Sequence, residues 1–572
     1  MSDDESQRPP RPKLPTQQLT ILAVARFAEP LATTSIYPYL PQMVRDFGVE
    51  ETEVAKWAGI TSAVFSVFQS FSAVPWGKIA DSWGRKPSLI TGLVCTMACF
   101  LVWGLSTSLP MAITVRAIQG ASNGNIGIIR TMVAELVPEK ELQPRAFSIM
   151  PLVWALGSVV GPAFGGFFAD PARQYPSLFG GVWFFEKFPY ALPNLIATVF
   201  FLVSVTGATL FLKETLAGKR DERDWGLLWG KRLGRALKWD KTQDRRRRSF
   251  VDGEATAPLV PSQIRPKKPR DLPTPGSPEI FTKQTVLIIL AYFFLALHSV
   301  AFDQNVTVFL NYPVMEHTPE NTKLPFYFNG GFGLGSGTIG TIFMLYGITC
   351  GLVQFILFSP MVTRWGVLNC YKTCCEETLS RTFNCKLLAN RLTALGVIMP
   401  IAYILTPYTS LFPTSESRLL ALAFVLALKA FSIIVAFPSV TILLTNSAKS
   451  LRILGTLNGF VTMFSGFGRA LGPASTGLAF TWGAKNGYVV TAYFFLAAMA
   501  VLGAIPVFWV VEGNGPTASA EDSDAEDNET LVNSSRVLAD ESAIDDSAIE
   551  SEESEPLLAS PKSGAASTAR QN

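Results

Sequence analysis

Twelve apolar stretches, each long enough to cross a lipid bilayer, recur along this chain of 572 residues. A transmembrane helix needs about 20 apolar residues. The first six spans are expected at about 19–41, 55–80, 87–106, 110–133, 145–169 and 191–212. The second six are expected at about 284–312, 338–361, 388–410, 418–446, 453–480 and 487–511. This series predicts an all-α integral membrane protein with 12 transmembrane helices, because helices satisfy their own backbone polar groups in lipid.

Charged residues are concentrated outside these stretches. Of the 48 Lys and Arg and 45 Asp and Glu residues, 51 lie in residues 1–18, 213–283 and 513–572, which leaves 42 for the other 423 residues. Such a body cannot cover a water-facing surface, so a soluble multidomain enzyme is excluded and the lipid bilayer is the expected partner. Basic residues do not interleave with aromatic ones on a folded module, so no nucleic-acid partner is expected.

The same distribution predicts the domain organisation. The charges of the segment between the two sets of spans sum to +8, and those of the C-terminal segment sum to −11. We expect a disordered cytosolic N-terminus (1–18), an N-terminal six-helix half (19–212), a basic cytosolic connector (213–283), a C-terminal six-helix half (284–512) and an acidic, disordered cytosolic tail (513–572).

Orientation follows from the Lys and Arg residues of the loops. With the N-terminus inside, the cytosolic loops and connector hold thirty of these residues and the opposite loops hold seven. Cytosolic loops carry the excess of positive charge, so both termini are expected in the cytosol. The connector is either a solvated link or a basic amphipathic helix on an anionic leaflet, the latter because Lys231, Arg232 and Arg235 recur at helical spacing beside Trp225 and Trp229.

The second span ends in W-G-K-I-A-D-S-W-G-R-K, residues 76–86. Gly77 and Gly84 are expected to allow a close approach and a tight turn. Asp81 is expected to pair with a cation or accept from helix-terminal amides, while Arg85 and Lys86 anchor the loop at the cytosolic face.

Two more motifs follow. The fourth span contains R-A-I-Q-G-A-S-N-G, with Arg116, Gln119 and Gly120 at its key positions, and the fifth contains G-S-V-V-G-P-A-F-G-G. The glycines of the fifth span form a face for close helix contact, and its proline bends the helix. A repeat of the Gly-Pro pair in the eleventh span predicts internal symmetry. The residues concerned are Gly157, Gly161, Pro162 and Gly165, and in the repeat Arg469, Gly472 and Pro473.

The three motifs together resemble those of the major facilitator superfamily, over about residues 19–512. The stretch F-A-E-P-L-A-T-T-S-I-Y-P-Y-L-P and the K-E-T-L after the sixth span resemble its fungal drug:proton antiporter and zinc-induced-facilitator-like branch. The resemblance implies two pseudo-symmetric six-helix halves that rock about a central cavity lined by spans one, four, seven and ten. It also implies that Arg469 braces a gate opposite Asp81.

Ionisable residues inside the spans are the candidates for proton coupling and substrate binding, since charge at membrane depth is costly. Arg26 and Glu29 share a helical face, either as a structural pair beside Pro30 or as a cavity-facing site. Asp303 is a stronger proton-carrier candidate than His298, because a buried histidine is more often tucked against backbone groups. The candidates are Arg26, Glu29, Arg116, Asp303, Lys429 and His298.

Two segments stand apart from the spans. The stretch at about 367–387 is polar and rich in cysteine, and it is either a metal-responsive loop or an artefact of the gene model; we expect no bound metal elsewhere. In the tail, E-S-E-P-L-L fits an acidic dileucine signal for sorting adaptors, with Glu553, Leu557 and Leu558 as its key residues. The expected location is the plasma membrane, or alternatively the vacuolar or endosomal membrane.

The resemblance implies a secondary active transporter, and we expect a monomer that exports a small organic molecule or drug by proton-coupled antiport. The proton gradient supplies the energy, so no cofactor is expected. An enzyme is not expected, because the sequence has no phosphate-binding loop or nucleophile motif. The alternatives are a nutrient sensor that does not transport and a proton symporter that imports a nutrient.

Overall fold

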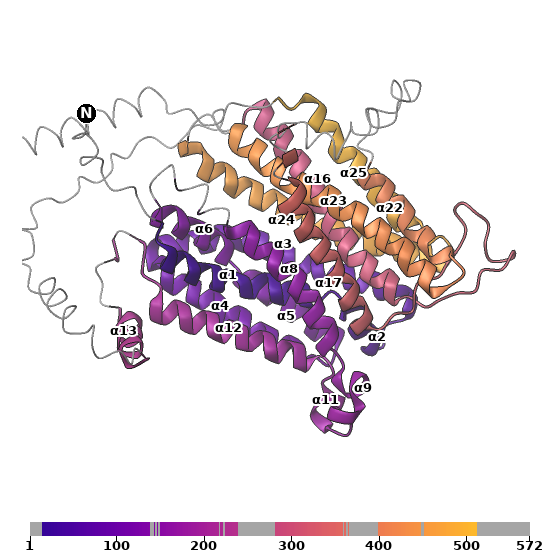
Figure 1. Cartoon of the computed structure of the whole chain (residues 1–572), viewed down its shortest axis with the longest axis horizontal. Helices are drawn as coiled ribbons and strands as arrows, with labels where there is room; N and C mark the ends of the chain where they lie inside the picture. Colours follow the sequence, from indigo (N-terminus) through magenta and orange to yellow (C-terminus); the bar gives the residue numbers. More distant parts are fainter. Residues whose placement is uncertain are drawn as a thin grey trace, which may run out of the picture. The chain divides into compact units, whose positions relative to one another are not determined.

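A computed structural model describes residues 14–137, 142, 146, 149–216, 218–220, 224–237, 281–358, 360, 361, 364, 398–447 and 451–511. Apart from residue 451, these belong to one unit of the chain, residues 1–448 and 452–515. Its long helices run side by side (Figure 1). The cysteine-rich stretch at 367–387 and the tail residues Glu553, Leu557 and Leu558 lie outside the described residues.

All six spans predicted for the N-terminal half fall on helices. The main helices are α1 (Thr16–Ser35), α2 (Leu40–Asp46), α3 (Val54–Trp83), α4 (Arg85–Gly104), α5 (Leu109–Ser122), α6 (Asn125–Leu136), α8 (Ile149–Phe168) and α12 (Ala191–Phe211). Shorter elements are η1 (Glu51–Glu53), α9 (Pro171–Gln174), α10 (Pro176–Phe179), α11 (Trp183–Lys187) and the connector helix α13 (Trp225–Leu237). The first span is α1 with α2, and the fourth is α5 with α6.

The described parts of the six spans predicted for the C-terminal half also fall on helices. These are α16 (Lys283–Asn311), α17 (Ser336–Leu352) followed by η2 (Val353–Phe358), α22 (Ile398–Tyr408) followed by η3 (Thr409–Leu411), α23 (Ser415–Ser447), α24 (Leu451–Asn486), and α25 (Thr491–Ala504) followed by η4 (Ile505–Trp509). Over the described residues, 6 helices are long and apolar enough to cross a membrane, or up to 7 if α1 and α2, which meet at 53°, form one broken span. The all-α membrane fold predicted from the sequence is confirmed.

Glycines set the contacts between α8 and α1 and between α24 and α16. A Cβ atom on Gly161 would lie 2.0 Å from Thr34 Oγ1, and one on Gly472 would lie 2.2 Å from the carbonyl oxygen of Leu297. No side chain fits at these distances, so the close helix contact predicted from the Gly-Pro motif and its repeat is confirmed. The same pairing of spans, fifth on first and eleventh on seventh, recurs in the two halves.

The contacts between the halves repeat in the same way. A Cβ atom on Gly59 of α3 would lie 2.3 Å from the carbonyl oxygen of Pro473 in α24. One on Gly340 of α17 would lie 2.7 Å from the carbonyl oxygen of Pro162 in α8. In both places the motif proline of one half faces a glycine of the other, as a pseudo-two-fold relation between the halves requires.

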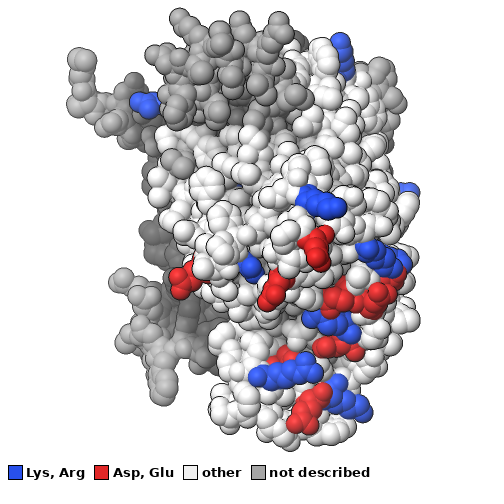
Figure 2. All heavy atoms as spheres, turned by 90° about the vertical axis from the view of Figure 1, so that its right-hand side faces the viewer, with Lys and Arg blue, Asp and Glu red and all other residues white. Residues whose placement is uncertain are grey.

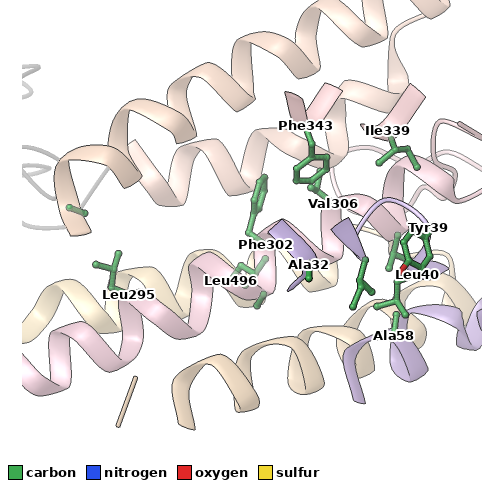
Figure 3. Packing of buried hydrophobic residues seen from close by; sticks show 14 of the residues in the cluster. Ala32, Tyr39, Leu40, Ala58, Leu295, Phe302, Val306, Ile339, Phe343 and Leu496 are labelled. Carbon is green, nitrogen blue, oxygen red and sulfur yellow. The ribbon is translucent and has the colours of Figure 1, made fainter. Parts of the chain in front are cut away.

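The apolar core is continuous across both halves. Buried residues of the first half, such as Ala32, Tyr39 and Ala58, belong to the same cluster as Phe302 and Phe343 of the second half (Figure 3). The tight contacts of the glycines and this shared core make one packed body out of the two sets of spans.

At the end of the body near α2, polar contacts join the two halves. Lys485 Nζ of α24 lies 2.7 Å from Glu53 Oε1 of η1, and the hydrogen bond raises the pKa of the Lys485 ammonium. Arg45 donates to Asn311 Oδ1 of α16 at 2.8 Å. Figure 2 shows basic and acidic side chains beside one another over this face. This end, predicted to be non-cytosolic, is therefore held shut in the structure.

The other end of α3 is open to its surroundings. Phe71 is 66% exposed and Val74 is 58% exposed. The close approach predicted for Gly77 is wrong in this structure, since a Cβ atom there would meet nothing within 4 Å. The reason is that Gly77 lies on an uncovered face of α3, whereas its neighbour Trp76 packs against α5 and donates to the carbonyl oxygen of Ala121 at 2.8 Å.

Candidate functional site

The ion pair of the first half is made within α1. Arg26 and Glu29, one helical turn apart, are paired and buried, as the sequence predicts. Asn123, at the break between α5 and α6, donates its amide to Glu29 Oε1 at 2.8 Å. The guanidinium of Arg26 lies 5.4 Å from the ring of Trp154. Glu29 thus has a cation and an amide as partners, and both are buried with it.

Arg116 of α5 lies between aromatic rings and has no carboxylate within its described contacts. Its guanidinium carbon is 4.4 Å from the ring centre of Phe65 and 5.6 Å from that of Trp103. Its Nη1 donates to Gln119 Oε1 at 2.9 Å, one turn further along the motif. The rings stabilise the cation through their π faces, and Gln119 accepts a hydrogen bond from one of the five N–H donors of Arg116.

The ion pair of the second half joins two helices. Asp303 of α16 accepts a hydrogen bond from Lys429 of α23. The Lys429 side chain is 0% exposed and the Asp303 side chain is 27% exposed. The ammonium lies 5.1 Å from the ring centres of both Phe302 and Tyr346. The structure therefore brings together two candidates that lie 126 residues apart in the sequence.

His298 is packed into the core and lies five residues before Asp303 on α16. It is buried, and its Nδ1 lies 2.8 Å from the hydroxyl oxygen of Tyr403. The tucked histidine considered from the sequence is what the structure shows, although its partner is a phenol of α22 and not a backbone group. Its predicted part in proton coupling stays a prediction.

Tyr37, in the bend between α1 and α2, links the charged residues of the two halves. It interacts electrostatically with Asp303 and Arg469 of the second half and with Arg116 of the first. The sequence reading missed it because a tyrosine carries no charge. The signal was present, since Tyr37 belongs to the I-Y-P-Y-L-P stretch that supports the family resemblance.

Arg469 is placed differently from the expectation. It interacts electrostatically with Glu29, Tyr37 and Arg26, which puts it with the central charges. Asp81 pairs instead with Arg85, one turn further along the chain, at 2.6 Å. The predicted brace between Arg469 and Asp81 is therefore wrong for this structure, because Arg469 is the nineteenth residue of α24 and its neighbour Gly466 packs against Ser70, eleven residues before Asp81 in α3.

The loop between α3 and α4 is held by acids from elsewhere in the first half. Gly84 has φ +115, a conformation that disfavours other residues, so the predicted tight turn is confirmed. Arg85 Nη2 lies 3.2 Å from Glu135 of α6. The carboxylate of Glu214 accepts the backbone N–H groups of Arg85 and Lys86 at 3.0 Å each, which satisfies the free amides at the start of α4.

The connector helix α13 begins beside this loop. Asp224 pairs with Lys86 at 2.6 Å, and a Cβ atom on Gly230 would lie 2.0 Å from the carbonyl oxygen of Leu210 in α12. Trp225 and Trp229 are 62% and 61% exposed. The sequence reading missed Glu135, Glu214 and Asp224 as partners of the motif, because they lie outside the spans or at their ends.

The geometry defines a class. A bundle of apolar helices in two related sets buries paired charges where the sets meet, and within the described residues no group of three or more His, Cys, Asp or Glu side chains is placed to hold a metal ion. This is the construction of a membrane transporter. The chain belongs to the Major Facilitator Superfamily, whose family model matches residues 22–375. It is a secondary transporter that binds small-molecule substrates, and not an enzyme.

Comparisons with individual proteins agree. The chain is 36% identical over 531 residues to the Major facilitator superfamily multidrug transporter mfsB of Aspergillus fumigatus, covering 87% of this chain and 84% of that protein. It is 26% identical over 462 residues to Protein ZINC INDUCED FACILITATOR-LIKE 1 of Arabidopsis thaliana, covering 80% and 82%. The crystal structure of a D-xylose-proton symporter has the same fold, with a TM-score of 0.56 at 13% identity, over 88% of this chain and 100% of that one.

Proposed function

We propose that this protein exports a small organic molecule in exchange for protons. The proposal rests chiefly on one observation, the pairing of the partly exposed Asp303 with the fully buried Lys429 of a neighbouring helix. The cation favours the ionised form of the carboxylate, so a proton that reaches Asp303 would compete directly with this pair. The name of the Aspergillus fumigatus relative, a multidrug transporter, supports the choice of substrate class.

The mechanism follows from what protonation does to this pair. A proton on Asp303 removes its charge, so Lys429 loses its counter-ion and the contact between α16 and α23 weakens. Loss of a contact shifts the balance between inward-facing and outward-facing states by the free energy of that contact. The Glu29 carboxylate would serve as the second proton site, with Arg26 as its cation.

The remaining motif residues are assigned to the conformational change. The glycine and proline positions of α8 and α24 would let the halves rock on each other, and the Asp81–Arg85 loop would guard the cytosolic end. The closed end beside Lys485 and the exposed segment of α3 support an inward-facing state with both termini cytosolic. We propose the plasma membrane as the site of action, or the vacuolar or endosomal membrane if adaptors read the Glu553 to Leu558 signal.

The test begins in a yeast strain that lacks its own drug exporters. Expression of the chain should raise resistance to members of a panel of small organic compounds. Compounds that respond should then leave proteoliposomes containing purified protein faster when a pH gradient is imposed, and Asp303→Asn should abolish that dependence. Gradient-dependent efflux by Asp303→Asn at the wild-type rate would contradict the proposal.

The same experiment separates the alternatives. A nutrient sensor would bind compounds without moving any of them in proteoliposomes. A symporter would accumulate compound on the side that protons enter. Only an antiporter moves compound and protons in opposite directions, which a pH-sensitive dye inside the vesicles reports.

A further inference from the structure

The charges buried in the described spans do not balance. Each of the two carboxylates, Glu29 and Asp303, has its own cation in Arg26 and Lys429. Two arginines remain, Arg116 of α5 and Arg469 of α24, and neither has an ion pair among the described residues. Arg116 is buried and Arg469 is half-buried. Unpaired buried cations are costly, so an anion that neutralises them would bind favourably.

These two arginines lie against the same stretch of α3. The guanidinium carbon of Arg116 in the first half is 4.4 Å from the ring centre of Phe65. Arg469 of the second half lies beside Gly466, whose Cβ position would be 2.1 Å from Ser70 Oγ. Both arginines also interact electrostatically with Tyr37. Arg116 is 2% exposed. The Nε atoms of both arginines are buried and have no hydrogen-bond partner among the residues that the structure describes. Each guanidinium therefore has a donor left over, and guanidinium donors match the geometry of a carboxylate.

Two buried amides of α16 are also unsatisfied. Gln304 and Asn305 follow Asp303 on α16, each is 3% exposed, and neither side chain has a hydrogen-bond partner among the described residues. Aromatic rings of Phe65 and Trp103 flank the Arg116 guanidinium. The free guanidinium donors and the ring faces beside Arg116 suit a flat organic molecule with a negative end.

We propose that the transported substrate is a small organic anion of the carboxylate class, held between Arg116 and Arg469 beside Tyr37. The inference rests on the proposed function, since it names the substrate of that transporter. Because the two arginines belong to different halves, an anion bound to both draws the halves together and closes the path around itself. Asp303 and Lys429 would neutralise each other, so the two arginines would bind the anion.

The test uses purified full-length protein in lipid nanodiscs without any gradient. Benzoate, 2-naphthoate and 9-anthroate are each titrated beside the primary amide and the aminomethyl cation of the same ring system, and binding is followed by calorimetry. At least one carboxylate should bind at least about tenfold more tightly than its neutral and cationic counterparts, because only it matches the two guanidiniums.

Variants identify the site. Arg469→Gln should weaken carboxylate binding at least about tenfold, and Arg469→Lys should restore part of it. Arg116→Gln carries less weight, since removal of a side chain between two rings can unfold the protein. Arg418→Gln is the matched control, because it removes the same charge at the exposed start of α23, where Arg418 donates to the carbonyl oxygen of Phe412.

The outcomes separate this inference from the proposed function. If none of the carboxylates binds more tightly than its counterparts, or Arg469→Gln binds like Arg418→Gln, the anion site is refuted, whatever the flux assay shows. If carboxylates bind selectively and Arg469→Gln loses them, the site stands even where a pH gradient drives no flux. In that case the proton-coupled mechanism alone fails.

Discussion

The two halves of this transporter each bury a carboxylate beside a cation, but they build the pair differently. In the first half Arg26 and Glu29 lie on one helix, and an amide from Asn123 completes the partners of the acid. In the second half Asp303 and Lys429 come from α16 and α23. A pair within one helix moves with that helix, whereas a pair between two helices holds them together.

The two carboxylates also differ in how exposed their side chains are. The side chain of Glu29 is 6% exposed and that of Asp303 is 27% exposed. Under the proposed mechanism, a proton would reach Asp303 more easily than Glu29, and its arrival would break a contact between helices. We therefore propose the conformational switch for the second half and a mainly structural or secondary role for the first.

The largest effect is expected for Asp303→Asn. Lys429 then lies fully buried without a counter-ion, which costs about 3 kcal/mol, equivalent to about a hundredfold change in an equilibrium constant. Proton-driven transport in proteoliposomes should therefore fall about a hundredfold. The matched double variant Asp303→Asn with Lys429→Met removes both charges and should regain thermal stability without regaining proton coupling.

A smaller effect is expected for Glu29→Gln. The glutamine keeps the shape and still accepts from Asn123, and only the charge opposite Arg26 is lost. We expect about a tenfold fall in transport, as for the loss of one charged hydrogen bond of about 1.5 kcal/mol. A loss as severe as that of Asp303→Asn, measured in the same vesicles, would overturn the assignment of the switch to the second half.

The two halves also differ in how closely their motif glycines approach a neighbouring helix. A Cβ atom at either position would lie against a backbone carbonyl oxygen, at 2.2 Å from that of Leu297 for Gly472→Ala and at 2.6 Å from that of Leu31 for Gly161→Ala. Overpacking of this kind costs about 1–3 kcal/mol, and we expect the larger loss of thermal stability at Gly472. Gly207→Ala on α12 is the control, since nothing lies within 4 Å of its Cβ position, and it should be neutral.

The smallest effect is expected at the closed end. Lys485→Gln removes an exposed ion pair between the halves, and because solvent screens such pairs it should shift the balance of states only about twofold toward opening. Spin labels at Thr52 and Asn486, in a background without native cysteines, would report the distance distribution. High salt screens this ion pair, so the distance distribution of the wild-type protein should widen in high salt. The distribution of the variant should not change with salt, because the pair is already absent.

The sequence predicted residue types at the site better than their partners. Arg26 and Glu29 could be paired from spacing alone, because residues three apart share a helical face. Asp303 and Lys429 could be recognised as costly charges within spans, but periodicity gives no distance between spans seven and ten. Tyr37 and Asn123 carry no charge, so hydropathy does not distinguish them from other polar residues of a helix end.

The loop motif shows the same limit. The sequence placed Gly84, Asp81 and Arg85 in one turn, and the structure agrees. It did not give Glu135 or Glu214, which reach the loop from α6 and from the residues after α12. It also assigned Arg469 to the wrong region, because a position along a helix does not say which residues of other helices lie at the same depth.

The sequence by itself determined that this chain spans a membrane repeatedly, that its halves are related and that few charges lie within the spans. Those properties follow from the length, apolarity and spacing of single segments, which are local. Only the tertiary structure decided that Asp303 meets Lys429, that Arg116 and Arg469 share Tyr37, and that one end of the body is closed. Each of these depends on side chains from different helices meeting at one depth, which is fixed by helix packing and not by any one segment.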